Sequence, residues 1–442
     1  PTAAKDVRSW EQNDYVIRVF DRVDALPPDL WAALLQAEQD QCRPCAPFMT
    51  PGYLAALQHT GCASADTGWA LHLVTIWRPA APSTPQPNNP VSEQAPHLPT
   101  HDRLCAVTVL YAKTHSYGEY VFDWAWADAY HRHGLDYYPK GVVAVPFTPV
   151  PGPRLLATDA AARTALARAL VGACERLQLS SLHLLFAHAA DVAAAQAAGL
   201  MLRHTVQFHW ENTAGWRSFD AFLASLNQDK RKKIRQERRK VSDAGVRFHT
   251  LAGRAITTED WDFFYRCYER TYLEHGNAPY LSRAFFAALA AAQPDNWLLC
   301  VATRHNAEGT PTPIACSLIA VTSNSESEDG QKTSESQPKV AYGRYWGALE
   351  RVDSLHFEAC YYQAIDYAIA NGLARVEAGA QGEHKLARGY RPVVTRSLHH
   401  LADPGLKRAV AHYLPRERAQ IAEAQAALAA ESPFRKTGDH DG

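Results

Sequence analysis

Hydrophobic and polar positions follow the same order in two stretches of the chain that lie far apart. Residues 47–50 lead into an aromatic and aliphatic run at 53–57, and residues 279–282 lead into a matching run at 285–289. The two stretches align at an offset of 232 residues (279 − 47). Each predicts an extended entry, a Thr or Ser N-cap and then a helix. Two copies at this spacing indicate duplicated domains rather than a solenoid.

Strands and helices are predicted to follow both runs in one order. Apolar stretches predict strands at 69–74, 104–111 and 120–126 in the first half, and at 297–302, 314–321 and 342–346 in the second. Further elements are predicted as helices at 159–177, 191–198 and 357–370, and as strands at 181–186, 201–210 and 373–378. This order is typical of mixed α/β sheets with helices on their faces. We expect two domains, at 1–212 and 213–435.

Two polar segments interrupt this pattern. Residues at about 79–101 are rich in Pro, Ser, Asn and Gln, and residues at about 323–338 are rich in Ser, Glu and Gln. Neither segment can bury enough apolar surface to fold, so both are predicted to be disordered insertions between strands. The alanine-rich stretch 419–430 predicts a terminal helix.

A concentration of positive charge stands out on a nearly neutral chain. Eight of the eleven residues 230–240 are basic, whereas the whole chain has 45 basic and 46 acidic residues. A hydrophobic stripe that starts at Phe219 and continues through Ile234 and Val241 places the run on a helix, at 229–243. The run is either a solvated helix face or a site for phosphate or carboxylate groups. In the second case the binding residues would be Arg231, Lys232, Arg235 and Arg239.

Several blocks of the sequence resemble a bacterial family of predicted N-acyltransferases described as FemAB-like. These blocks are residues 115–126, 137–140, 145–150, 344–347, 356–362 and 377–385, and the resemblance extends from about residue 47 to Arg435. The basic run is also similar, loosely, to a pattern of the Fem-type aminoacyltransferases of peptidoglycan bridges. The resemblance implies two tandem domains of the Gcn5-related N-acyltransferase fold, in agreement with the repeat.

The resemblance also implies a reaction. It would be transfer of an acyl or aminoacyl group to an amine, with a link to peptidoglycan precursors. Acyl-CoA or aminoacyl-tRNA would be a co-substrate and no cofactor would be tightly bound. The glycine loop with which acetyl-CoA enzymes of this fold hold the pyrophosphate is not found in the sequence, so acetyl-CoA is not favoured.

The block at 377–390 is the best catalytic candidate. It leaves a predicted strand through glycines and then presents Glu383, His384, Lys385 and Arg388 within six residues. Transfer to an amine needs a proton acceptor, for which Glu383 or His384 would serve, and a donor to the developing oxyanion, for which Lys385 would serve. Arg388 would bind substrate. The alternative is a polar loop with an ion pair.

Other charged and aromatic residues are candidates for the same site. Glu358, at the start of a predicted helix, is either a base or a residue that suits a helix N-terminus. If 120–126 is a strand, Glu119 and Asp123 share one face, where they could line a cleft, and the aromatic face is core. The remaining predicted substrate-binding residues are Trp126, Arg344, Tyr345 and Trp346.

Composition limits the class of protein. No apolar run approaches the roughly 20 residues of a membrane helix, and the start lacks a signal-peptide pattern. Among nine cysteines only Cys42 and Cys45 form a close pair, which favours reduced thiols in the cytoplasm. No metal motif is found. The hypotheses are an N-acyltransferase that holds a nucleotide-linked or other small anionic substrate, or tRNA, in a cleft between domains; a non-catalytic module that binds RNA or cell-wall fragments; and a purely structural basic helix.

Overall fold

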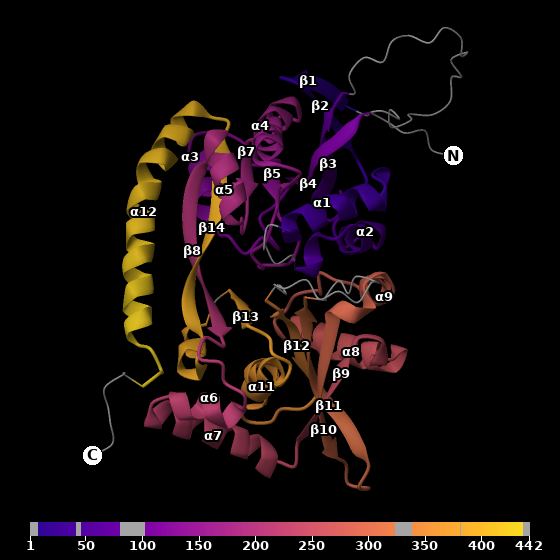
Figure 1. Cartoon of the computed structure of the whole chain (residues 1–442), viewed down its shortest axis with the longest axis vertical. Helices are drawn as coiled ribbons and strands as arrows, with labels where there is room; N and C mark the ends of the chain where they lie inside the picture. The colour runs from indigo at the N-terminus through magenta and orange to yellow at the C-terminus, as the bar shows by residue number, and fades with distance from the viewer. Residues whose placement is uncertain (1–7, 41–45, 80–101, 323–337, 381, 436–442) are drawn as a thin grey trace.

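The computed structural model describes residues 8–40, 46–79, 102–322, 338–380 and 382–435, which form a 14-stranded sheet flanked by helices (Figure 1). The mixed α/β prediction is confirmed. The strands are β1 (Arg8–Gln12), β2 (Tyr15–Phe20), β3 (Trp69–Arg78), β4 (Arg103–Lys113), β5 (Lys140–Val143), β6 (Leu156–Ala157), β7 (Ser181–Leu184), β8 (Met201–Glu211), β9 (Arg247–Ala252), β10 (Trp297–His305), β11 (Pro311–Val321), β12 (Val340–Ala348), β13 (Arg375–Ala380) and β14 (Arg391–Leu401).

The helices cover both faces of this sheet. The α-helices are α1 (Pro28–Asp40), α2 (Pro51–His59), α3 (Trp124–Arg132), α4 (Ala160–Arg176), α5 (Ala189–Ala197), α6 (Phe219–Ser225), α7 (Gln228–Asp243), α8 (Thr258–Glu274), α9 (Arg283–Ala292), α10 (Leu355–Phe357), α11 (Gln363–Ala370) and α12 (Pro404–Ala430). Short 3₁₀ helices are η1 (Val23–Ala25), η2 (Pro47–Met49), η3 (Gly253–Ala255), η4 (Pro294–Asn296) and η6 (Glu383–Arg388), and η5 (Glu358–Tyr362) is a π-helix.

Counted outward from the β14–β8 pair, the strand order shows the same series of pairings on its two sides, except that β1 is an extra strand at the edge of the first half. It runs β1-β2-β3-β4-β5-β7-β14-β8-β13-β12-β11-β10-β9, and the parallel pairs among these strands of the described residues are β5–β7 and β12–β13. The last strand of each half lies in the other half's side of the sheet: β8 pairs with β13, and β14 pairs with β7. Figure 1 shows β8 and β14 side by side between the halves, with α12 along them. The sheet is therefore continuous across the division at 212/213, which stays a prediction as a domain boundary.

The aligned runs of the two halves meet each other. Thr50 caps α2 and Ser282 caps α9, as predicted. The rings of Tyr53 and Phe285, which align at the offset of 232, lie 5.5 Å apart at 87°. Thr50 Oγ1 donates to Gln293 Oε1 across the junction at 3.0 Å. Because both runs belong to one buried hydrophobic cluster, the junction is part of the core.

The predicted aromatic strand at 120–126 is wrong. The segment is a loop followed by α3, because Gly118 (φ 80°) and Tyr120 (φ 60°) take left-handed backbone conformations that end an extended run. The predicted faces are also wrong. Phe122 and Trp124 are 56% and 47% exposed, whereas the neighbouring carboxylates of the loop are buried.

The predicted helix that combined Phe219 with the basic run is two helices. Leu226 is extended between them, and the side chain of Asn227 caps α7 by accepting from Lys230 N. The bounds of α7 agree with the prediction within one residue. The terminal helix α12 begins 15 residues before the predicted start (419 − 404) and includes Pro415. Nearly all of the two predicted insertions, together with Cys42 and Cys45, lies outside the described residues.

Candidate functional site

A buried group of charged side chains lies where β4 ends and β5 begins. Lys113 and Lys140 are register partners across these strands. Lys140 Nζ donates to Glu119 Oε2 at 2.9 Å and to Ser116 Oγ at 2.7 Å, and it also donates to Asp123 Oδ2. We name these five residues the Lys140 cluster. The loop between the strands thus supplies the carboxylates that offset two opposed lysines.

The Lys140 cluster is almost completely removed from solvent. Lys140 is 0% exposed, Glu119 3% and Asp123 4%. Glu119 Oε1 and Asp123 Oδ1 have no hydrogen-bond partner among the described residues. Buried polar atoms are nearly always paired, and a buried oxygen without a donor is costly. Both carboxylates can therefore accept a donor from a ligand.

Burial brings the pKa values of two residues of the Lys140 cluster close to neutral pH. Burial raises the pKa of Glu119 to about 7, although the charge of Lys140 opposes this shift. Burial lowers the pKa of Lys113 to about 7, with the Lys113 ammonium nitrogen 3.4 Å from the centre of the Trp69 ring. Burial also opposes ionisation of Asp123, but Lys140 and Tyr137 outweigh it, so the pKa of Asp123 lies below its ordinary value. The cluster therefore holds groups that can gain or lose a proton near neutral pH.

The predicted catalytic block lies in the second half, at a divergence of two strands. β12 and β13 pair only from Val340 to Tyr342 and then separate. Lys385, which is 3% exposed, donates from Nζ to the carbonyls of Ala378 and Gly379 at 2.7 and 3.1 Å. Burial lowers the pKa of Lys385 to about 8. Lys385 thus bonds to β13 where this strand separates from β12, and it carries a proton that is easily lost.

The rest of the block combines exposed and buried residues. Glu383 and His384 are exposed, and His384 Nε2 lies 3.0 Å from the Tyr361 hydroxyl. Burial, followed by the charges of Arg388, Lys385 and Lys233, lowers the pKa of His384. Lys233 belongs to α7, so the structure brings the basic helix and the predicted catalytic block together.

Two ion pairs link α7 to this block. Arg388 is buried and donates to Glu237 Oε1 of α7 at 2.7 Å. Arg238 of α7 lies 3.1 Å from Glu358 Oε1, which also accepts from Gln363 at 2.7 Å. Burial raises the pKa of Glu358, which begins the π-helix rather than an ordinary helix. Arg388 and Glu358 are therefore tied to α7.

The outer face of α7 remains open to solvent. Lys232, Arg235 and Arg239 are exposed, and Arg231 is half-buried. Figure 1 places α7 at the end of the second half, away from the junction of α2 and α9. The structure thus does not bring these four residues to the contact between the halves, where the sequence suggested a cleft.

Arg344, Tyr345 and Trp346 of β12 lie in three different environments. Arg344 reaches the first half and donates to Phe147 O at 2.7 Å and to Thr148 Oγ1 at 3.2 Å. Tyr345 packs in the core against α8 and α9. Trp346 lies beside His356, with ring centres 5.4 Å apart, and both line a cavity of about 350 Å³. Arg344 thus links the two halves by hydrogen bonds.

Sequence reasoning missed several members of the first-half site. Lys113 has no predicted role, and Ser116, Tyr137 and Lys140 belong to blocks of resemblance without a predicted role of their own. The blocks of resemblance 115–126 and 137–140 contain these last three residues. The ion pair of Lys140 with Glu119 depends on the pairing of β4 with β5, however, which no local pattern shows. Trp126, a predicted binding residue, is buried against His183 and His399.

The described ranges contain neither a cluster of metal-ligating side chains nor a helix suited to crossing a membrane. No group of three or more His, Cys, Asp or Glu there could hold a metal ion. None of the described helices has the length and apolar character needed to cross a membrane.

Solved structures with some likeness to the chain are distant. The C-terminal DUF2156 domain of a proposed lysylphosphatidylglycerol synthetase from Agrobacterium fabrum is 10% identical, with 60% of this chain and 80% of that one covered and a TM-score of 0.39. L-PGS from Bacillus licheniformis is 8% identical, with 75% and 87% covered and a TM-score of 0.42. A conserved protein of unknown function from Bacteroides thetaiotaomicron is 13% identical, with 53% and 74% covered and a TM-score of 0.36. Likenesses this low support no statement about activity.

Comparison at the level of sequence is more informative. No curated protein matches the chain. The profile of the FemAB-like family, described as peptidoglycan biosynthesis/recognition, matches residues 22–436 and so nearly the whole sequence. The chain therefore belongs to the FemAB-like family.

Proposed function

We propose that this protein is an N-acyltransferase that transfers an acyl or aminoacyl group to an amine of a peptidoglycan precursor. The family description supports the connection to peptidoglycan. The observation that carries the proposal is the pair of buried carboxylate oxygens, Glu119 Oε1 and Asp123 Oδ1, that lack a donor beside Lys140. An amine is a donor that fits them, because its N–H groups and its positive charge complement buried carboxylates.

The proposed chemistry uses Glu119 as the general base. An amine attacks an acyl carbon only in its neutral form, so the acceptor must lose a proton first. A carboxyl whose pKa burial raises to about 7 is poised to take that proton at neutral pH. Lys140 keeps the second oxygen of Glu119 in place at 2.9 Å and so orients the base.

The second half would hold the anionic co-substrate. Lys233, Lys385 and Arg388 concentrate positive charge around His384 at η6, and the exposed cations of α7 extend it. Such a surface suits the phosphates of an acyl-CoA, an aminoacyl-tRNA or a nucleotide-linked precursor. Lys385 would donate to the oxyanion that develops on the acyl group. The segment 145–150 connects the two places, since Pro149 accepts from Gln207 and lies beside Gly379, and Phe147 bonds the loop at Gly118.

The fold proposed with this function is a tandem pair of Gcn5-related domains. The matching strand order on the two sides of the sheet supports an internal duplication in which each copy gives its last strand to the other. Among the named strands of the described residues, the parallel pair of each half lies at the same place counted outward from the β14–β8 pair. A reducing cytoplasmic location stays a prediction.

A product assay tests the function. The protein is incubated with a panel of acyl-CoA thioesters and aminoacyl-tRNAs and with a muropeptide that carries a free amine, and mass spectrometry follows the muropeptide. We expect its mass to increase by one acyl or aminoacyl group with the wild type and not with Glu119→Gln. The control is Asp128→Asn, because Asp128 is exposed on the neighbouring helix α3. Equal product from wild type and Glu119→Gln would refute the role of Glu119.

A non-catalytic binding module is the second candidate. Tyr117, Phe122 and Trp124 are each about half exposed on the loop that covers the Lys140 cluster, and the rings of Tyr117 and Trp124 lie 5.6 Å apart. Exposed rings of this kind can stack on bases or sugars. Retention of a muropeptide without any change in its mass would favour this second function.

A further inference from the structure

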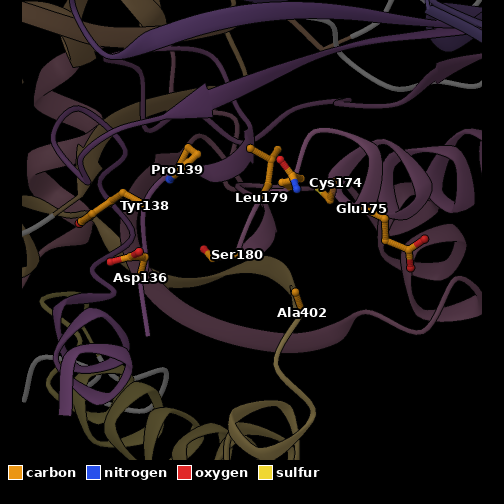
Figure 2. A pocket seen from close by; sticks show the side chains of 9 residues that line it. Asp136, Tyr138, Pro139, Cys174, Glu175, Leu179, Ser180 and Ala402 are labelled. Atoms are coloured by element: carbon orange, nitrogen blue, oxygen red, sulfur yellow. The ribbon is translucent and has the colours of Figure 1, made fainter. Parts of the chain in front are cut away.

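A pocket opens on the surface of the first half, close to the Lys140 cluster. It has a volume of about 550 Å³. Its lining residues are Asp136, Tyr138, Pro139, Cys174, Glu175, Gln178, Leu179, Ser180 and Ala402. Figure 2 shows Asp136, Tyr138 and Ser180 on one side of this pocket and Glu175 on the other. Tyr138 and Ser180 are half-buried, so each is partly exposed to solvent and partly packed against the interior.

A short chain of hydrogen bonds leads from the pocket to Glu119. The Tyr138 hydroxyl lies 2.8 Å from Ser116 Oγ. Ser116 Oγ accepts from Lys140 Nζ at 2.7 Å, and Lys140 Nζ donates to Glu119 Oε2 at 2.9 Å. Every member between the pocket and Glu119 can donate a hydrogen.

A longer chain starts at Ser180 and enters the same cluster. Ser180 Oγ lies 3.3 Å from Ser181 Oγ, which lies 2.8 Å from His183 Nε2. The Tyr137 hydroxyl lies 3.1 Å from the same nitrogen and donates to Asp123 Oδ2 at 2.6 Å. Asp123 Oδ2 in turn accepts from Lys140, so this chain also reaches Glu119 through Lys140.

The strand β14 adds a branch to the longer chain at His183. His183 Nδ1 lies 2.7 Å from Nδ1 of His399, its register partner on β14, and His399 Nε2 lies 2.8 Å from Ser397 Oγ. At that distance one of the two Nδ1 atoms must carry the hydrogen. Burial, reinforced by nearby positive charges, keeps the pKa of both rings well below the ordinary value, so the pair is neutral. A neutral pair can exchange which ring carries the hydrogen without burying a charge.

The proposed reaction requires a path of this kind. An ammonium acceptor and an acyl donor give an amide, the protonated leaving group and one free proton, so each turnover releases one proton. Glu119 receives that proton in a place closed to solvent, and it must lose the proton before the next turnover. Because Glu119 is only 3% exposed, a hydrogen-bonded chain gives the proton a route to water that does not depend on the route by which the amine enters.

Resting on the proposed function, we propose that the pocket lined by Tyr138 and Ser180 is the proton outlet of the Lys140 cluster. Along the short chain, Lys140 passes a proton to Ser116, Ser116 passes its own to Tyr138, and Tyr138 releases its own to water in the pocket. The carboxyl of Glu119 then rotates to bring the protonated oxygen to Lys140, and Lys140 takes the proton, so each group returns to its starting state. Asp136 and Glu175 on the pocket wall favour the positive charge that emerges.

The test follows protonation of Glu119 and needs no substrate. The charged groups that face Glu119 are Lys140 of β5, Asp123 of the loop and Lys113 of β4. After a rapid pH jump across neutrality, time-resolved infrared spectroscopy follows the carbonyl band of protonated Glu119. The band is assigned by its absence from Glu119→Gln.

Variants of the two pocket residues separate the outcomes. We expect the double variant Tyr138→Phe, Ser180→Ala to slow the change of the Glu119 carbonyl band after the pH jump at least about tenfold. A positioned proton-transfer group contributes rate factors of this order or larger. Tyr413→Phe is the control, because Tyr413 is 48% exposed on α12. If the double variant does not fold, Ser116→Ala combined with Tyr137→Phe interrupts both chains further inside. The proposal that this pocket is the proton outlet would be overturned by an unchanged rate in a folded variant that lacks both chains, or by the absence of a Glu119 band in the wild type.

The result is independent of the product assay. A slowed band in a protein that makes no acylated muropeptide would support the outlet and count against the proposed function. An unchanged band in an active enzyme would overturn the outlet alone.

Discussion

Replacing Lys140 with methionine is the most informative perturbation of the Lys140 cluster. Methionine fills a similar volume but removes the charge that Glu119 and Asp123 share. Breaking a buried ion pair by removing one partner costs about 3–5 kcal/mol. Glu119 can avoid much of this cost by keeping its proton. Asp123 loses the ammonium that holds its pKa below the ordinary value, so it is left either charged without that partner or protonated, and both states cost stability at neutral pH. We therefore expect a loss of about 3–5 kcal/mol at neutral pH, and a smaller loss in acid.

The assay is urea unfolding followed by tryptophan fluorescence at neutral and acidic pH. The matched control is Lys232→Met, which removes an exposed lysine of α7 and should leave the unfolding midpoint unchanged. Adding Glu119→Gln and Asp123→Asn to Lys140→Met removes the charges left behind and should recover most of the lost stability. The reasoning is refuted if Lys140→Met is as stable as the control, or if the triple variant is no more stable than the single one.

Three further predictions concern pH, the junction and the basic helix. The folded protein holds the proton of Glu119 more tightly than the unfolded chain does, because burial raises the pKa of this carboxyl from 4.5 to about 7. The free energy of unfolding should therefore fall by up to about 3 kcal/mol as pH rises through this range. Urea midpoints of Glu119→Gln should show a smaller fall, and an equal fall would contradict the raised pKa of Glu119. Arg344→Met should cost about 2–3 kcal/mol through lost charged hydrogen bonds to the first half, and calorimetry that finds an unchanged Tm would contradict that role. If α7 binds RNA, affinity should fall steeply between about 50 and about 200 mM salt; filter binding should show a weaker salt dependence for the triple glutamine variant of Lys232, Arg235 and Arg239, and an equal slope would place the RNA elsewhere.

Much of the fold could be predicted from the sequence because its signals are local. Apolar runs predicted the strands now seen as β3, β4, β10 and β11, and Thr50 and Ser282 act as the predicted caps. The exchange of β8 and β14 could not be predicted, since pairing between distant strands leaves no mark in local periodicity. The loop before α3 was missed because alternation outweighed the turn signal at Gly118, and a non-glycine residue, Tyr120, takes positive φ beside it.

The candidate site divides in the same way. The block with His384 and Lys385 was predicted from charged residues that follow glycines, and the structure places it against the basic helix. Glu119 and Asp123 were predicted as binding carboxylates for the wrong local reason, a strand face. Their actual partner, Lys140, comes from the next strand, so only three-dimensional pairing reveals that these carboxylates are buried around an ammonium.

The most direct test of the account is a crystal structure of the protein with an amine-bearing muropeptide fragment. If Glu119 is the general base, the amine nitrogen will lie within about 3.2 Å of Glu119 Oε1, and Lys140 will still be bonded to the other oxygen of Glu119. An amine seated at the surface of α7 and η6, with the carboxylates of Glu119 and Asp123 unchanged and out of its reach, would contradict it.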